Sequence, residues 1–417
     1  MKNRSTAILI GVYGNSRDRE ICEDHLLELE SLGKTYGLIT TYKICFFVKK
    51  KDPATLIKRG AIDKILNILN ESELFYVIFD DEISPTQQRN LEKELKKTVI
   101  DRTELILGVF DKHAKTKEAK IQISLAQARY QLPRLKRLWT HLERQRMKGG
   151  YLKGMGERQL EVDKRILKSE ISKLKKRLKE IEKKRATQRK KRIREENLIF
   201  SIVGYTNSGK STLLNALTKA DVLVEDKLFS TLDTTTKRFI LPNKQKILFI
   251  DTVGFIRKLP HDLIASFKST LEEIVYSDVL INVIDLSDKN VFEKIESSLD
   301  VLKKLKVEDK PIIYVFNKID KVKDHSLIKK LKERYPTSVK ISALKKIGFD
   351  DFLKIIMDSI KFKIKKFKLK IPQNEVKLIN ELIEKGNITS KKYKDNYLFL
   401  EVEIPKTLFY KIERFII

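Results

Sequence analysis

The segment LIFSIVGYTNSGKSTLLNAL, residues 198–217, decides the fold of this chain. Its apolar run at 198–203 predicts a β-strand, and the residues after Lys210 carry apolar side chains at helical spacing. The loop between them has the pattern G-x-x-x-x-G-K-S, whose glycines let backbone N–H groups curl around a phosphate at a helix N-terminus. We therefore predict a phosphate-binding loop made of Gly204, Tyr205, Thr206, Asn207, Ser208, Gly209, Lys210 and Ser211.

Three charged or polar side chains near this loop have defined chemistry. We expect the Lys210 ammonium group to bridge the β- and γ-phosphates and the Ser211 hydroxyl to ligate Mg²⁺. A second apolar strand, ILFIDTVG, ends in Asp251, which is expected to hold Mg²⁺ through water. The Gly254 N–H can sense the γ-phosphate, so Lys210 and Gly254 are the predicted catalytic residues. The predicted contacts of this second loop are Asp251, Thr252, Val253 and Gly254.

The residues that follow two later strands indicate which base the site selects. The strand PIIYVFNKID ends in Asn317, Lys318, Ile319 and Asp320. A carboxylate at Asp320 can accept hydrogen bonds from guanine N1 and N2, whereas adenine would leave it buried and unpaired. The backbone of Ser342, Ala343 and Leu344 can meet guanine O6. All of these motifs follow predicted strands, where a doubly wound parallel sheet binds its ligand, so we predict a GTP site.

The stretch LFSTLDTTTKRF, residues 228–239, is expected to supply a threonine that completes the Mg²⁺ shell in the triphosphate state. Spacing alone does not decide which threonine this is; the candidates are Thr231, Thr234, Thr235 and Thr236. Phe255 follows Gly254 where many GTPases have a glutamine that orients water, so we expect slow intrinsic hydrolysis. Asn207 can help to hold a monovalent cation or can simply shape its loop, and we favour the second interpretation.

The composition of the whole chain limits its class and its partners. The 417 residues suggest two or three domains, and 41% hydrophobic residues exclude a wholly disordered chain. With 87 basic and 57 acidic residues the formal charge is +30, which attracts nucleic acid or an anionic membrane face. A merely Lys-rich surface would give the same total, so the clustering of the charge separates the two interpretations better than its sum. No apolar run approaches the roughly 20 residues of a membrane span.

The cysteines and histidines exclude other chemistry. Cys22 and Cys45 are too few for a disulfide framework or a Cys-rich zinc site, and the five histidines show no ligand spacing. The N-terminus reads as a first strand at 6–12 and not as a signal peptide. We therefore expect a monomer in a reducing cytoplasm, with no membrane span and no metal other than Mg²⁺ or a monovalent cation.

The pattern predicts four parts. Residues 1–118 form an N-terminal α/β domain, with helical patterns at 17–32, 55–70 and 86–97 and strand candidates TAILIGV, TYKICFFV, LFYVIFD and ELILGVF. Residues 119–196 form an antiparallel helical hairpin, bent near Pro133, with a glycine-rich tip at 149–156. Residues 197–360 form the nucleotide-binding domain. Residues 361–417 form a small α/β appendage with helix 374–385, a turn at 386–387 and strand 397–403.

The positive charge concentrates in the predicted hairpin. Between Arg134 and Arg194 there are 24 basic and 7 acidic residues, a net charge of +17 in 61 residues. Its second helix carries an apolar seam, expected to pair with the first, at Leu160, Leu167, Ile171, Leu174, Leu178 and Ile181. A solvated coiled coil usually mixes charge signs, so this excess favours a helical pair that lies along RNA.

The chain resembles the HflX family of translational GTPases over nearly its whole length. The segments that carry the resemblance are DPATLIKRGAIDKI (52–65), DDEISPTQQRNLE (80–92), 101–135, HLERQRMKGGYLKGMGERQLEVDKR (141–165), GYTNSGKST, FSTLD and DTVGF. The hairpin tip departs from the family pattern G-x-G-L-R-G-P-G-E-[TS]. Lys153, Met155 and Arg158 replace Arg, Pro and Thr or Ser, which keeps the charge and makes the loop less rigid.

The resemblance implies a function. HflX-like proteins bind the large ribosomal subunit and its RNA, and they split stalled or heat-damaged ribosomes. By the family pattern Thr231 is the Mg²⁺ threonine, the hydrophobic residue at Phe255 is normal, and the nucleotide-binding segment is Phe229, Ser230, Thr231, Leu232 and Asp233. The alternatives are a ribosome-assembly or other RNA-binding GTPase without splitting activity, and a non-enzymatic RNA- or membrane-surface-binding protein.

Overall fold

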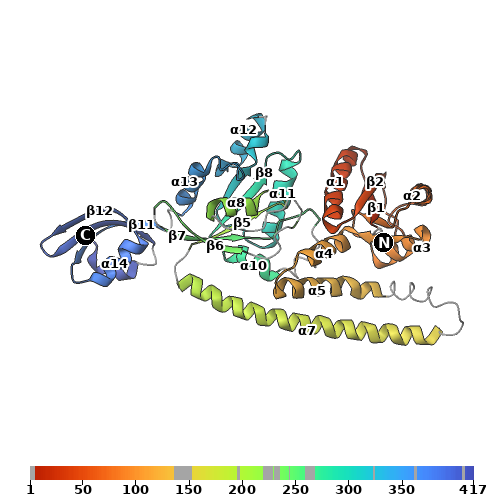
Figure 1. Cartoon of the computed structure of the whole chain (residues 1–417), viewed down its shortest axis with the longest axis horizontal. Coiled ribbons are helices and arrows are strands. Elements are labelled where there is room, and N and C mark those ends of the chain that lie inside the picture. Colours follow the sequence, from red (N-terminus) through yellow and green to blue (C-terminus); the bar gives the residue numbers. More distant parts are fainter. Residues whose placement is uncertain are drawn as a thin grey trace. The chain divides into compact units, whose positions relative to one another are not determined.

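A computed structural model describes most of the chain, and its residues group into two compact units (Figure 1). The described residues are 5–135, 153–194, 198–218, 229, 235–243, 245–258, 268–322, 325–360, 364–405 and 409–417. The first unit comprises 1–183, 227–232 and 259–268; the second comprises 184–226, 233–258 and 269–417.

The first unit contains a four-stranded parallel sheet in the order β2-β1-β3-β4. Its strands are β1 (Thr6–Tyr13), β2 (Ile39–Phe47), β3 (Tyr76–Phe79) and β4 (Thr98–Asp101). Its helices are α1 (Arg19–Tyr36), α2 (Arg59–Glu71), α3 (Pro85–Leu95) and α4 (Arg102–His113). Ile8, Ile10, Val77 and Phe79 of the strands pack with α2 and α3 in one buried core, as the alternation of strands and helices predicts.

One predicted strand in this unit is wrong. ELILGVF, residues 104–110, lies in helix α4, and the fourth strand is the short TVID at 98–101. The side chain of Asp101 accepts a hydrogen bond from the Glu104 backbone N–H and so caps the helix. Because α4 is buried on several sides, its apolar run lacks the gaps that distinguish a helix from a buried strand.

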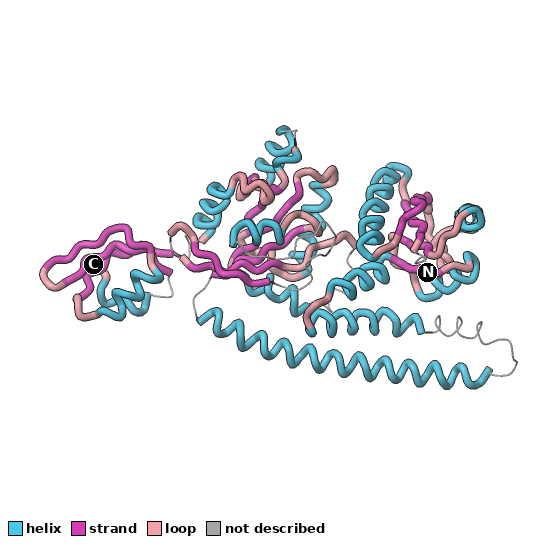
Figure 2. Tube along the Cα trace, in the orientation of Figure 1, coloured by secondary structure: helices cyan, strands magenta, loops and turns pink. Residues whose placement is uncertain are grey.

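The helical hairpin is described on both sides of its tip. Helix α5 (Lys117–Gln131) passes into a 3₁₀ turn η2 (Leu132–Arg134) that contains Pro133, at the predicted bend, and α7 spans Lys153–Arg194. Figure 2 shows α5 beside α7, and the contact consists of Ile121 and Leu125 of α5 with Ile171, Leu174 and Leu178 of α7. The glycine-rich tip lies partly outside the described residues, and Gly154 and Gly156 stand in the first turns of α7.

The second unit contains a six-stranded sheet in the order β10-β9-β8-β5-β7-β6, parallel except for β6 against β7. The strands are β5 (Leu198–Gly204), β6 (Thr235–Ile240), β7 (Lys246–Asp251), β8 (Val279–Asp285), β9 (Ile312–Asn317) and β10 (Ser338–Lys340). The helices are α8 (Lys210–Thr218), α10 (Lys268–Tyr276), α11 (Val291–Lys304), η3 (Ile319–Lys321), α12 (His325–Arg334) and α13 (Phe349–Ser359).

Two cores cover opposite faces of this sheet. Val283 and Val315 pack with residues of α8 and α13, while the next residues along the strands, Ile284 and Phe316, pack with α11 and α12. Successive strand residues point to opposite faces, so helices cover both sides. This is the predicted doubly wound fold.

The C-terminal region forms a three-stranded antiparallel sheet in the order β11-β13-β12 with its own apolar core. Its elements are β11 (Ile364–Pro372), α14 (Val376–Lys385), β12 (Asn387–Lys394), β13 (Tyr397–Pro405), α15 (Phe409–Ile412) and η6 (Glu413–Phe415). Asn387 starts strand β12 where we expected only a turn. The sequence NITSKKYK hides this edge strand because most of its side chains are polar.

Among the described residues, no helix combines the length and the apolar character that a membrane span needs. The same residues contain no group of three or more His, Cys, Asp or Glu side chains placed to hold a metal ion.

Candidate functional site

Two glycines fix the backbone of the loop between β5 and α8. Gly204 has φ 138°, and a Cβ there would lie 2.3 Å from the Val283 carbonyl oxygen. Gly209 has φ 91°, and a Cβ there would lie 2.2 Å from Asn317 Nδ2. A side chain at either position would clash and would require a strained backbone. The predicted loop therefore has the conformation that its glycine spacing implied.

The charged groups around this loop are fully buried. Lys210 starts α8, and its Nζ donates a hydrogen bond to the Tyr205 carbonyl oxygen at 2.8 Å. Burial lowers the pKa of Lys210 to about 8. Asp251 at the end of β7 accepts a hydrogen bond from Ser211 Oγ at 2.7 Å, and burial raises its pKa. A cation and an anion thus face each other where strand ends and a helix start meet.

Three buried oxygens at this loop lack a hydrogen-bond partner in the part of the chain that the structure describes. They are Thr206 Oγ1, Ser208 Oγ and Asp251 Oδ1. Buried polar atoms are normally satisfied, and an exception marks a place where a ligand or ion completes the set. Hydroxyl and carboxylate oxygens are ligands that Mg²⁺ prefers. The residues present therefore fit a magnesium–phosphate group.

The loop after β7 packs directly on the phosphate-binding loop. The Phe255 N–H donates to the Gly204 carbonyl at 2.9 Å, and the Thr206 N–H donates to the Phe255 carbonyl at 2.7 Å. A Cβ at Gly254 would lie 2.9 Å from Lys210 Nζ, so this loop lies directly against the lysine. Two further side chains are buried here: Thr252, whose Oγ1 donates to Ile202, and Val253.

The predicted base-recognition motifs lie beside the same loop, held by the side chains of Asn317 and Lys318. Asn317 Nδ2 donates to the Ser208 carbonyl at 2.8 Å, and its Oδ1 accepts from the Ala343 N–H at 2.9 Å. Lys318 Nζ donates to the Asn207 carbonyl at 2.9 Å and pairs with Asp285. The predicted phosphate and base segments are therefore brought together.

The edge of this group is accessible to a base. Asp320 is half-buried, and a hydrogen bond from Ser342 holds its pKa below the ordinary value. Ile319, its neighbour in the chain, is half-buried, while the Leu344 side chain is 75% exposed. The carboxylate of Asp320 is thus ionised and can accept hydrogen bonds from a purine that has two adjacent N–H donors.

Other predicted residues have different surroundings. The Tyr205 hydroxyl accepts a hydrogen bond from the Arg257 N–H. Asn207 has φ 60°, a left-handed conformation that asparagine tolerates, which fits its loop-shaping interpretation. Phe229 groups with the first unit, where its ring packs edge-on against Phe110 at 4.5 Å. Outside the described residues lie Ser230, Thr231, Leu232, Asp233 and Thr234.

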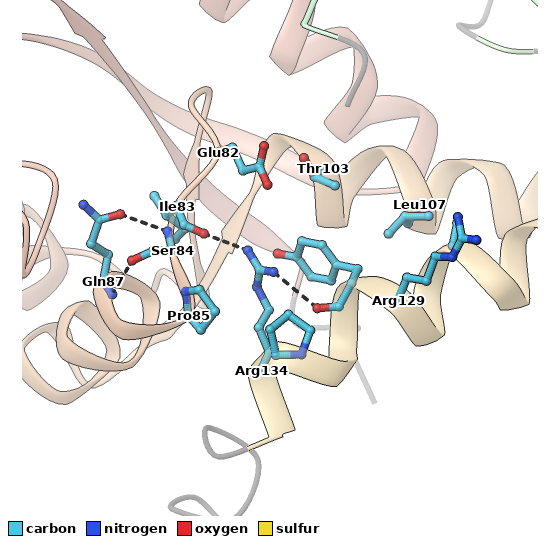
Figure 3. A pocket seen from close by; sticks show the side chains of 12 residues that line it. Glu82, Ile83, Ser84, Pro85, Gln87, Thr103, Leu107, Arg129 and Arg134 are labelled. Atoms are coloured by element: carbon cyan, nitrogen blue, oxygen red, sulfur yellow. Dashed lines mark hydrogen bonds between the residues drawn. The ribbon is translucent and has the colours of Figure 1, made fainter. Parts of the chain in front are cut away.

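A second buried polar cluster, which the sequence analysis missed, lies at the base of the hairpin in the first unit; Figure 3 labels two of its residues, Ile83 and Arg134, beside a cavity. Arg134 donates to Gln88 Oε1 at 3.1 Å and to the Ile83 carbonyl at 2.7 Å, and it pairs with Asp101 at 3.4 Å. Its guanidinium stacks on the Tyr130 ring at 3.6 Å, and the Tyr130 hydroxyl donates to Asp101. We call these five residues the hairpin-base cluster.

The hairpin-base cluster borders a cavity of about 510 Å³ between the start of α3 and the end of α5. Burial raises the pKa of Asp101 to about 6. The cluster fixes the end of α5 to the sheet through hydrogen bonds that span distant parts of the chain. The only sequence signal was the buried strand end at Asp101, followed by a helix cap.

The outer surface of α7 is strongly basic. Lysine and arginine side chains along its described part are exposed, while Leu174 and Leu178 face α5. The exposed basic residues are Lys164, Arg165, Lys168, Lys173, Lys175, Lys176, Arg177, Lys179, Lys183 and Lys184. We call this set the α7 basic surface.

The fold and the site define the class of protein. A doubly wound sheet carries a glycine-fixed phosphate loop, a buried lysine at a helix N-terminus, an aspartate at the next strand end and an Asn-Lys-x-Asp segment after a third strand. This combination defines a P-loop GTPase.

Comparison with known proteins identifies the family. Family models described as GTP-binding GTPase N-terminal, GTP-binding GTPase middle region and 50S ribosome-binding GTPase match residues 23–111, 113–192 and 199–318. GTPase HflX of Chlamydia pneumoniae is 44% identical over 416 residues, covering 99% of this chain and 88% of that protein. GTPase HflX of Escherichia coli (strain K12) is 37% identical over 402 residues, covering 96% and 93%. The chain belongs to the HflX family and is a GTPase.

A similar solved structure is a GTP-binding protein from the archaeon Sulfolobus solfataricus in complex with GDP. It is 28% identical, the match covers 86% of this chain and 99% of that one, and the TM-score is 0.43.

Proposed function

We propose that the site in the second unit binds GTP with Mg²⁺, using the residues that the sequence predicted. The three unpartnered oxygens of Thr206, Ser208 and Asp251 support this assignment, because a phosphate and a hydrated cation would satisfy them. Ser211 and Thr231 are the direct Mg²⁺ ligands of the proposal, and Asp251 acts through water. Asp320 selects guanine.

The chain's own groups carry out the switching. Mg²⁺, when bound, neutralises charge on the β- and γ-phosphate oxygens. Lys210 exchanges its Tyr205 carbonyl partner for phosphate oxygens, and the adjacent Gly254 responds because it lies against that lysine. Phe255 has no polar side chain to orient water and is buried at 2% exposure. Intrinsic turnover is therefore slow in this proposal, and the ribosome stimulates it.

We infer that the partner is the large ribosomal subunit, bound through its RNA. The observation that carries this inference is the α7 basic surface, ten exposed lysine and arginine side chains along one long helix. The family model that matches residues 199–318 is described as a 50S ribosome-binding GTPase. Polyanionic RNA would neutralise the surface, release counterions and make binding dependent on salt.

The proposed activity is the splitting of stalled or stressed ribosomes. GTP orders residues 226–238 and the loop at Gly254, which favours the subunit-bound form. The hairpin then occupies space on the large subunit that disfavours the joined ribosome, and hydrolysis releases the protein. GTP and GDP thereby select between the bound and the free protein.

Sedimentation of ribosomes with the protein under GTP, GDP and a non-hydrolysable GTP analogue tests the switch. We expect co-sedimentation with large subunits under GTP and the analogue, and much less under GDP. Equal binding in all three would contradict the proposal.

Light scattering of intact ribosomes tests the activity. A fall in scattering after addition of protein and GTP is expected for splitting. Unchanged scattering, with retained GTP-dependent binding to subunits, would point to a role in subunit assembly.

A further inference from the structure

The two cysteines of the chain lie next to each other although they are far apart in sequence. Cys22 is on α1, and Cys45 is on β2, directly beside Gly11 of β1 in the strand register. A Cβ at Gly11 would lie 2.5 Å from Cys22 Sγ and 3.3 Å from Cys45 Sγ. Both sulfurs therefore occupy the space above a glycine, and they share a hydrogen bond.

This arrangement separates the roles of the two thiols. Cys22 is buried at 4% exposure, whereas Cys45 is half-buried and can be reached from solvent. The hydrogen bond from Cys22 lowers the pKa of Cys45, and the same bond together with burial raises the pKa of Cys22. Burial and the carboxylates of Glu23 and Asp80 oppose the thiolate of Cys45, while Arg19 favours it. The accessible thiol is thus the nucleophile of the pair.

We propose that Cys22 and Cys45 form a reversible redox pair that hydrogen peroxide oxidises to an intramolecular disulfide. In the first step the Cys45 sulfur attacks a peroxide oxygen, the O–O bond breaks, and Cys45 sulfenic acid and water form once the leaving hydroxide takes up a proton. In the second step the Cys22 sulfur attacks the Cys45 sulfur, the S–O bond breaks and a second water leaves. Two thiols are oxidised and one peroxide is reduced.

The disulfide would join the first helix to the edge strand of the N-terminal sheet. Strand β2 pairs on one side with β1 and is the outer strand of the order β2-β1-β3-β4. A cross-link between α1 and β2 restricts the unfolded chain. Oxidation should therefore raise the unfolding temperature of the first unit by several degrees, and a thiol reductant should reverse the shift.

The test treats the full chain with hydrogen peroxide, removes the peroxide with catalase, alkylates free thiols in denaturant and measures intact mass. We expect two alkyl groups before oxidation, none after it, and two again after reduction with dithiothreitol. The oxidised protein should remain monomeric, with a mass two hydrogen atoms lower. Two alkyl groups after oxidation, a disulfide-linked dimer, or terminal oxidation of Cys45 to sulfinic acid would each overturn the proposal.

Single serine variants assign the two roles. Cys22→Ser should stop at a Cys45 sulfenic acid that dimedone labels, whereas Cys45→Ser should leave the buried Cys22 unmodified under the same exposure. Both reduced variants should keep a cooperative urea-unfolding transition, followed by the fluorescence of Trp139 in the first unit, which shows that this unit folds. Dimedone labelling of Cys45→Ser in place of Cys22→Ser would reverse the assignment and contradict the geometry.

Discussion

The nucleotide site and the hairpin-base cluster are both buried and polar, but they differ in how many of their polar atoms have a hydrogen-bond partner. At the nucleotide site, oxygens of Thr206, Ser208 and Asp251 have no partner in the described part of the chain. In the hairpin-base cluster, every nitrogen of the Arg134 guanidinium donates a hydrogen bond and both Asp101 oxygens accept one.

This difference separates two uses of buried polarity. A satisfied cluster stabilises one arrangement of the chain, because removal of any member leaves another buried and unpaired. An unsatisfied cluster costs stability and is retained where a ligand completes it. Variants in the hairpin-base cluster should therefore lose stability, whereas variants in the nucleotide site should lose GTP turnover.

The largest effect is expected from Arg134→Met, which leaves Asp101 buried without its cation. Loss of one partner of a buried pair lowers the free energy of unfolding by about 3–5 kcal/mol. The measurement is urea unfolding followed by fluorescence of the single tryptophan, Trp139, which lies in the hairpin sequence. Arg129→Met, one turn earlier on α5, is the matched control; equal midpoints for the two variants would show that the cluster is not an anchor.

Lys210→Ala should leave folding intact and remove turnover. Loss of the cation that faces the transferred phosphate should reduce GTP hydrolysis by about 10²- to 10³-fold. Phosphate release in the presence of ribosomes measures the effect. Lys304→Ala, at an exposed lysine of the same unit, is the control and should keep full activity. Normal turnover by Lys210→Ala would place the chemistry elsewhere.

Asp320→Asn should change base selection. An amide cannot accept two hydrogen bonds from guanine as a carboxylate does, so we expect GTP affinity to fall by roughly 10- to 100-fold, or about 1.5–3 kcal/mol. Affinity for xanthosine triphosphate should rise, because its second carbonyl can accept from the new amide. Calorimetric titration of both nucleotides is the measurement, with Asp309→Asn as an exposed control. Retained GTP preference would refute the role of Asp320.

Neutralisation of the α7 basic surface should weaken RNA binding without affecting the nucleotide site. Lys173, Lys176 and Arg177 share one helix face. Their joint replacement by glutamine should lower the log–log salt slope by about 0.7–0.9 for each RNA phosphate that the helix no longer neutralises. Binding to large-subunit RNA over a salt series measures this slope. Glutamine at Lys289, Lys303 and Lys304 is the control, and identical slopes would exclude α7 as the RNA-binding element.

The smallest effect concerns pH. The pKa of Asp101 is raised from 3.8 to about 6, so between these values the folded protein retains a proton that the unfolded chain releases. The resulting stability is fully present below pH 3.8 and is lost as pH rises through about 6. The slope should stay below about 1.4 kcal/mol per pH unit. Urea midpoints of the unmodified chain should fall relative to those of Asp101→Asn over this range; parallel curves would contradict the assignment.

The order and the proximity of the site motifs could be predicted because their residues follow strand ends at fixed spacing. Lys210, Asp251 and Asn317 were placed in order by motif alone, and the structure brings them together. Helix α4 was misread because its apolar run has no polar face, and β12 was missed because its side chains are polar. These errors reflect burial on several sides and exposure at a sheet edge, which a local pattern cannot distinguish.

The hairpin-base cluster could not be predicted from the sequence for another reason. Four members come from α3, β4, α5 and η2, and each of these by itself is an ordinary polar residue, while Ile83, before α3, contributes only its backbone. Only the tertiary fold brings them together. The proximity of Cys22 and Cys45 could not be predicted for the same reason. Their shared neighbour Gly11 has no side chain, so no sequence pattern indicates that both sulfurs lie above it.

Asn317 has a consequence for nucleotide exchange. Its amide joins the carbonyl of Ser208, in the predicted phosphate loop, to the N–H of Ala343, in the predicted base-binding segment. The two predicted binding segments are therefore linked through this side chain. Loss of the phosphate contacts should therefore also weaken the base contacts, and the nucleotide should dissociate in a single concerted step. A partner that accelerates release would need to disturb this amide and the hydrogen bond from Lys318 to the Asn207 carbonyl.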